Sequence, residues 1–192
     1  HPRLMAVQMR DRPITDTTAD VLHRLEDLGL PYYLTGSEAL AFYAAPRQTM
    51  DADVVVALHP ERWDWLVATA FADAYLVADP IIYPTRALAS VLSSEGLGKV
   101  DLILRTGDPW GDSAMARRVR IHDARLGEVW ISSLEDLLLA KMDWSAGTSE
   151  LQLRDCRDLI RLNPGLDVAY VERFVDLLHL GAIWEKVRGA DD

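Results

Sequence analysis

Residues 51–56 read Asp51-Ala52-Asp53-Val54-Val55-Val56, and this short stretch is the most informative part of the chain. The run of valines predicts a buried β-strand, because β-branched side chains pack well on a pleated surface. Successive side chains of a strand point to opposite faces, so Asp51 and Asp53 are expected on one face and Ala52 on the other. The sequence therefore predicts two carboxylates that converge at the start of a core strand.

Two carboxylates beside a valine-rich strand repel each other unless a cation neutralises them. Hard divalent ions prefer carboxylate oxygens, so magnesium is the expected partner, with manganese as an alternative. An Asp-x-Asp pair by itself is a weak signal, because short motifs occur by chance and because the pair also suits a strand end or a loop edge. Its interpretation therefore depends on the neighbouring segments.

The segment before this strand predicts a strand, a turn and a helix. Residues 31–34 are typical of a short strand, and Thr35-Gly36-Ser37 leads into a helix expected over residues 38–44. Glycine lets the backbone approach a ligand closely, and the first amides of a helix bind phosphate oxygens, with the Ser37 hydroxyl as a further donor. Gly36 and Ser37 are therefore candidate phosphate-binding residues. The alternative is that Thr35 and Glu38 form a capping box that only starts the helix.

A third acid stands in the segment Lys99-Val100-Asp101-Leu102. Asp101 stands near the start of a strand expected over residues 100–104. If that strand lies beside the strand expected over residues 52–58, Asp101 joins Asp51 and Asp53. Three carboxylates can hold two metal ions, which activate an attacking oxygen and stabilise a leaving pyrophosphate. The alternative for Asp101 is an ordinary exposed acid at a strand end.

In combination, these segments resemble the polymerase-β nucleotidyltransferase superfamily. The resemblance consists of the Gly-Ser turn after a strand, the stretch 47–55 and the later segment 99–102, and it extends over about residues 31–185. It is strongest with small bacterial proteins that are uncharacterised or associated with toxin–antitoxin systems. It implies an α/β (α+β) fold in which a mixed sheet is flanked by helices and followed by a C-terminal helical subdomain.

The resemblance also implies roles for the matched residues. Asp51 and Asp53 would be metal ligands, and Asp101 would be a further ligand that acts as general base for the attacking hydroxyl. The Gly36-Ser37 turn would bind the phosphates of a nucleoside triphosphate. Two positions depart from the common pattern, because Ala52 replaces a larger aliphatic residue and a single glycine precedes the serine. Neither departure removes a functional group.

From Ser132 onward the leucines follow the helical period, so we expect an α/β domain over residues 1–131 and a helical one over residues 132–192. Lys141 lies on the first of these helices and is a candidate phosphate-binding residue. The alternative is a salt bridge from Lys141 to Asp155 or Asp158.

Elsewhere the sequence predicts a helix over residues 17–28, a helix from Pro60, strands over 75–77 and 87–92, and a hairpin of 119–122 with 128–131.

Composition limits the classes of partner. The 192 residues include 20 Lys and Arg against 30 Asp and Glu, and the resulting net charge of −10 disfavours a broad grip on long DNA or RNA. The arginines at positions 117, 118, 120 and 125 are interpreted as a solvated strand face, and the alternative is that they hold one phosphate-rich ligand. Cys156 is the one cysteine, which excludes an intrachain disulfide, and no apolar run approaches the roughly 20 residues of a membrane span. We therefore expect a cytoplasmic protein without a membrane partner.

Two hypotheses of function follow. The first is an enzyme that transfers a nucleoside monophosphate from a nucleoside triphosphate to a hydroxyl of a protein, a tRNA end or a small molecule. The acidity favours protein or small-molecule acceptors. The second is a non-catalytic binding module on the same fold, acting on a protein partner as a toxin–antitoxin component or through oligomerisation, because a fold does not dictate an activity.

Overall fold

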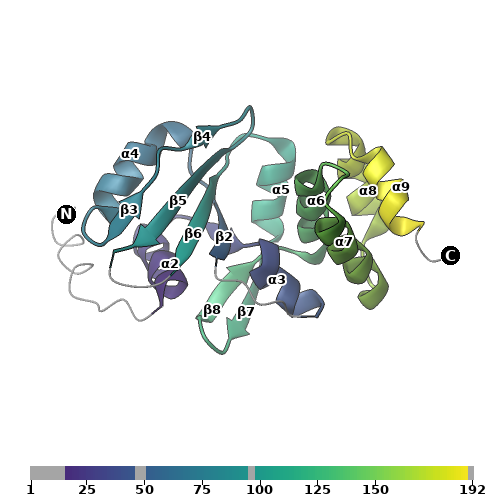
Figure 1. The fold of residues 1–192 in the computed structure, drawn as a ribbon, viewed down its shortest axis with the longest axis horizontal. Helices are drawn as coiled ribbons and strands as arrows, with labels where there is room; N and C mark the ends of the chain where they lie inside the picture. Colours follow the sequence, from purple (N-terminus) through teal and green to yellow (C-terminus); the bar gives the residue numbers. More distant parts are fainter. Residues whose placement is uncertain (1–15, 46–50, 95–97, 190–192) are drawn as a thin grey trace. The chain divides into compact units, whose positions relative to one another are not determined.

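The computed structural model describes residues 16–45, 51–94 and 98–189 (Figure 1). The chain divides into two compact units, which are described one at a time. The first comprises His1–Leu34 and Thr49–Ile131, and the second comprises Thr35–Gln48 and Ser132–Asp192. Within the described ranges, no helix combines the length and the apolar character that crossing a membrane requires.

The first unit is built on a mixed β-sheet, which confirms the predicted fold class. Its strands are Tyr32–Leu34 (β1), Asp51–Val56 (β2), Tyr75–Val77 (β3), Ile81–Ile82 (β4), Ala87–Ser93 (β5), Lys99–Leu104 (β6), Val119–Asp123 (β7) and Gly127–Ile131 (β8). They follow the order β3-β5-β6-β2-β1-β8-β7, and β4 also pairs with β5. The pairs β2–β6 and β1–β8 are parallel, and the other pairs are antiparallel. The predicted strands and the terminal hairpin are present, whereas the short strand β4 was not predicted.

Alternate side chains of the two central strands form the core of the first unit. Val54, Val56, Leu102 and Leu104 are fully buried. Helix α2 (Thr17–Asp27) packs against β6 and begins at Asp16, whose carboxylate accepts a hydrogen bond from a backbone amide of the first turn. These apolar contacts hold β2 and β6 in place, and the acids on the same strands are positioned by them.

Two other helical segments of the first unit differ from expectation. The helix predicted from Pro60 consists of three consecutive segments, which are η1 (Pro60–Arg62), α4 (Trp63–Leu66) and the π-helical η2 (Val67–Phe71). Helix α5 (Pro109–Arg117) was not predicted, although Asp108 caps it by accepting a hydrogen bond from Gly111 N at 2.8 Å. An Asp-Pro pair is a helix-start signal, but the residues after it lack a clear apolar period. Arg117 therefore ends a helix, and its interpretation as part of a strand face is wrong.

The second unit is helical, and the helices predicted after Ser132 are confirmed. Its helices are Gly36–Tyr43 (α3), Leu134–Ser145 (α6), Glu150–Leu162 (α7), Val168–Leu177 (α8) and Gly181–Arg188 (α9). Helix α6 packs against α3, α7 and α8, and α9 packs against α7 and α8. Leu138, Met142 and Cys156 are fully buried in this bundle. Ser133 starts α6, because its hydroxyl accepts a hydrogen bond from Asp136 N at 3.2 Å.

Candidate active site

The side chains of Asp51, Asp53 and Asp101 lie on one face of the sheet, where the parallel strands β2 and β6 are neighbours. Asp53 is directly opposite Asp101 in the register of the two strands. Ala52, between the two acids of β2, is 2% exposed, and its partner Val100 is fully buried on the opposite face. The alternation predicted for β2 and the pairing that brings Asp101 beside Asp53 are both confirmed.

Lys99 connects two of these acids, and no role was predicted for it. Its ammonium Nζ lies 3.2 Å from Asp51 Oδ2 and 2.9 Å from Asp101 Oδ2. The hydrogen bond to Asp101, together with that to Asp51, raises the pKa of Lys99 above its ordinary value and outweighs the opposing effect of partial burial. The signal was present in the sequence, because Lys99 stands two positions before Asp101 and a strand places both on one face.

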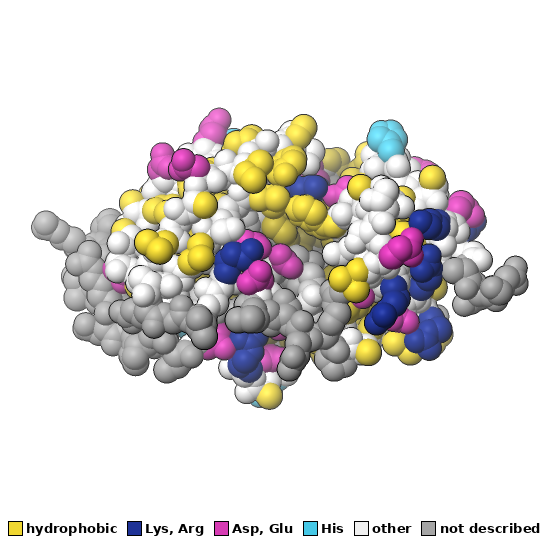
Figure 2. Space-filling view, in the orientation of Figure 1, with side chains coloured by type: hydrophobic (Ala, Val, Ile, Leu, Met, Phe, Trp, Pro, Cys, Tyr) yellow, Lys and Arg dark blue, Asp and Glu magenta, His cyan; other side chains and the backbone are white. Residues whose placement is uncertain are grey.

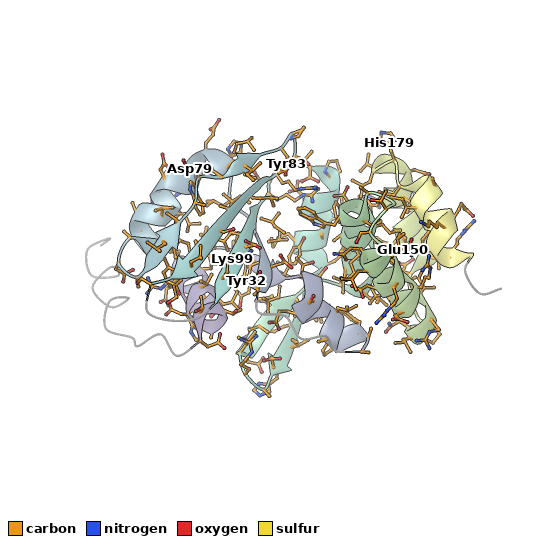
Figure 3. The ribbon with its side chains drawn as sticks, viewed as in Figure 1. Tyr32, Asp79, Tyr83, Lys99, Glu150 and His179 are labelled. Carbon is orange, nitrogen blue, oxygen red and sulfur yellow. The ribbon has the colours of Figure 1, made fainter. Side chains whose placement is uncertain are left out.

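The cluster is open to solvent. Figure 2 shows a dark-blue side chain among magenta ones on this part of the surface, and Figure 3 labels Lys99 at the same place. The side chain of Asp51 is 51% exposed, and those of Asp101 and Lys99 are 31% and 34% exposed. A ligand can therefore reach the carboxylates without the first unit having to open.

Ser90 holds the other oxygen of Asp101. Strand β5 is antiparallel to β6 and places Ser90 directly opposite Asp101, and the Ser90 hydroxyl donates a hydrogen bond to Asp101 Oδ1 at 2.5 Å. Lys99 contacts Oδ2, so both carboxylate oxygens have a partner and the orientation of the group is set. Nothing in the sequence marked Ser90, because the contact depends on the register between β5 and β6.

The predicted phosphate-binding residues Gly36, Ser37 and Lys141 belong to the second unit. Gly36 is the first residue of α3 and has a φ angle of 60°, in the left-handed region that glycine adopts without strain. Thr35 precedes the helix, and its side chain makes no capping hydrogen bond. The Thr35 half of the capping box, which was the alternative to phosphate binding, is therefore absent.

Lys141 has a structural contact inside the second unit. Its side chain is 4% exposed, and its ammonium lies 2.8 Å from Asp155 Oδ2 and 3.1 Å from the Gln152 side-chain oxygen. Of the two acids considered as partners, Asp155 is the one that Lys141 contacts, while Asp158 pairs with Arg161 at 3.0 Å. Lys141 thus connects α6 to α7, and its binding to a phosphate stays a prediction.

A cluster of three carboxylates such as Asp51, Asp53 and Asp101 is typical of a site for a divalent cation. In the described ranges, no three His, Cys, Asp or Glu side chains are gathered as ligands of one ion. At the aspartates, a positive charge is instead provided by the Lys99 ammonium between Asp51 and Asp101. The donor set nevertheless fits a hard cation, because it consists of carboxylates that already attract a positive group on an exposed face.

Comparisons with known proteins show similarity at the level of the fold. No family model matches the sequence, and no curated protein is similar enough to be matched. The solution structure of the antibiotic-resistance factor ANT(2'')-Ia matches with a TM-score of 0.51 at 16% identity, over 85% of this chain and 96% of that one. ANT(2'')-Ia in complex with adenylyl-2''-tobramycin matches with a TM-score of 0.51 at 15% identity, over 89% and 99% of the two chains. A proposed nucleotidyltransferase from Thermotoga maritima matches with a TM-score of 0.50 at 14% identity, over 75% and 94%. These similarities confirm the predicted nucleotidyltransferase fold.

Proposed function

We propose that this chain, which has the nucleotidyltransferase fold, transfers a nucleoside monophosphate from a nucleoside triphosphate to a hydroxyl group. The observation that best supports the proposal is the register of β2 and β6, which sets Asp53 opposite Asp101 on an exposed face. Acids at facing positions of neighbouring strands are unfavourable unless a cation lies between them. Such a cation is what a triphosphate substrate brings with it.

The three aspartates would hold the cation, magnesium or manganese. Bound there, it would stabilise the charge of the triphosphate and activate the attacking oxygen. Gly36 and Ser37 are proposed to bind phosphate oxygens through the first amides of α3 and the Ser37 hydroxyl. The positive end of the α3 dipole favours an anion at this end of the helix.

Asp101 is proposed to accept the proton of the acceptor hydroxyl. The acceptor oxygen forms a bond to the α-phosphorus, the bond from this phosphorus to the bridging oxygen of the β-phosphate breaks, and pyrophosphate leaves with the electron pair. Ser90 donates a hydrogen bond to Oδ1 of Asp101 and so fixes the orientation of the carboxylate that would take the proton. A carboxylate whose orientation is set in this way is suited to general-base catalysis.

The acceptor is proposed to be a protein or a small molecule, with a tRNA end as the third class. The net charge of −10 repels the phosphate backbone of a long nucleic acid and so favours protein and small-molecule acceptors over tRNA. Asp51 is exposed and Asp101 is half-buried, which is compatible with a protein or a small-molecule acceptor.

The test compares the wild-type chain with the double variant Asp51→Asn/Asp53→Asn. Each chain is incubated with magnesium or manganese and with one of the four nucleoside triphosphates, labelled on the α-phosphate or on the γ-phosphate. The candidate acceptors are the chain itself, total protein, tRNA and a small-molecule library. We expect transfer of the α label by the wild type and none by the double variant. Asp79→Asn is the matched control, because Asp79 is an exposed acid of the same unit (Figure 3). Equal labelling by all three chains, or transfer of the γ label, would overturn the proposal.

A further inference from the structure

Lys99 forms ion pairs with two acids of the aspartate cluster, Asp51 and Asp101. It lies opposite Asp51 in the register of β2 and β6 and two residues before Asp101 on β6, so all three side chains leave the same face of the sheet. The ammonium contacts one oxygen of each acid, Asp51 Oδ2 at 3.2 Å and Asp101 Oδ2 at 2.9 Å. One positive charge therefore links acids from two neighbouring strands.

We propose that Lys99 is a built-in counter-ion, which holds Asp51 and Asp101 together in the metal-free protein and is displaced from them when a divalent cation binds. Lys99 is then a positioning residue that sets the affinity of the site for the cation. The inference rests on the proposed function, because it assumes that the aspartates are the metal ligands.

The first step of the argument is repulsion. Asp51, Asp53 and Asp101 are three acids on a small area of two strands, and Asp53 directly faces Asp101. Like charges this close destabilise the folded chain unless a positive group lies among them. Of the three lysines of the chain, Lys99 is the one in the first unit, and its two ion pairs reduce the repulsion.

The second step is competition for the same oxygens. A carboxylate oxygen that accepts a short bond from an ammonium is a weaker ligand for a metal ion, because its charge is already partly neutralised. Asp51 Oδ2 and Asp101 Oδ2 are both engaged by Lys99. Within the described ranges the acids do not form a ready group of three ligands, and a cation that binds all of them has to replace the ammonium.

The test uses the full chain, without nucleotide, in three forms. Lys99→Met removes the charge and keeps the length of the side chain, Lys99→Arg keeps the charge, and Lys186→Met is the matched control on the exposed surface of α9 in the second unit. Binding of Mn²⁺ is measured by calorimetry, and thermal unfolding is measured in EDTA and at saturating Mn²⁺. Circular dichroism verifies folding, and Lys99→Gln replaces the methionine variant if that variant does not fold.

We expect Lys99→Met to bind Mn²⁺ about tenfold more tightly than the wild type, because the metal no longer competes with an ammonium. Its Tm in EDTA should fall below that of the wild type, and saturating Mn²⁺ should restore most of the difference. Lys99→Arg and Lys186→Met should keep the wild-type affinity.

The contrary results separate this inference from the proposed function. Equal or weaker Mn²⁺ binding by Lys99→Met, with binding by the wild type intact, overturns the role of Lys99 and leaves the proposed function standing. An unchanged Tm of Lys99→Met in EDTA also overturns it, because a counter-ion must stabilise the metal-free state. Absence of Mn²⁺ binding by every form overturns both proposals.

Discussion

Asp53 and Asp101 face each other across the parallel pair of strands β2 and β6. Their backbones are held by a ladder in which the pair Ala52 and Val100, on the opposite face, is buried in the core. The position of the two acids is therefore set by rigid secondary structure. Groups on strands are held more exactly than groups on loops, so conservative changes at these proposed catalytic acids should lower activity before they lower stability.

Removal of the proposed base should lower turnover and leave the fold intact. Asp101→Asn keeps the shape of the side chain but cannot accept a proton, and we expect kcat to fall by at least about 100-fold. Steady-state kinetics with the acceptor found in the labelling assay measures this effect, and thermal unfolding shows whether the fold is kept. The control Asp79→Asn should lose less than threefold in kcat. An equally small loss in Asp101→Asn would show that Asp101 is not the base.

Ser90 should affect turnover through its hydrogen bond to Asp101. Ser90→Ala removes the hydrogen bond to Oδ1, and a hydrogen bond to a charged group contributes about 1.5–3 kcal/mol, so we expect kcat to fall by about 10- to 100-fold. Ser90→Thr keeps the hydroxyl and should retain most of the activity. A loss of activity in Ser90→Thr as large as that in Ser90→Ala would contradict the role of this hydrogen bond.

Lys141 and Asp155 form a buried ion pair, and replacing one member should cost more stability than replacing both. Lys141→Met leaves the Asp155 charge buried without the Lys141 ammonium, and we expect the free energy of unfolding to fall by about 3–5 kcal/mol in urea titrations. Lys141→Met/Asp155→Leu replaces both by apolar groups and should recover most of this loss.

The same double variant also tests the predicted contact of Lys141 with a phosphate. Its stability is restored, so any increase in KM for the nucleoside triphosphate is due to a lost ligand contact and not to unfolding. A KM equal to that of the wild type would refute the phosphate role, while the structural pair would stand.

Cys156 should be unreactive in the folded chain. Burial raises the pKa of its thiol from an ordinary value of 9.0 to about 12, so the reactive thiolate is almost absent at pH 8. We expect Ellman's reagent to modify the native protein slowly and the denatured protein at once, with one thiol per chain.

The same shift in pKa predicts how stability depends on pH. The folded chain keeps the Cys156 proton up to a higher pH than the unfolded chain does, so this contribution to stability is complete below about pH 9 and is lost as the pH rises toward 12. Cys156→Ala should show a smaller loss of stability over that range in urea titrations. Identical pH dependence of the two chains would contradict the buried thiol.

Much of the fold was predictable because it depends on local patterns. The consecutive valines of β2 favour a strand through their β-branched side chains. Apolar residues alternate along the hairpin of β7 and β8, and the leucines after Ser132 follow the helical period. Helix α5 was missed because its apolar period is weak, although Asp108 and Pro109 signal its start. The grouping of helix α3 with the second unit was not predictable, because it depends on contacts between α3 and helices that lie far along the chain.

The sequence by itself determined that Asp51 and Asp53 share a face, because the alternation of a strand is a property of the backbone alone. Only the tertiary structure decided that Asp101 faces Asp53, that Ser90 holds one of its oxygens and that Lys99 bridges it to Asp51. These relations depend on hydrogen-bond ladders between strands from different parts of the chain. A shift of one residue in either ladder would move every side chain of the shifted strand to the opposite face, and local patterns carry no direct record of that register.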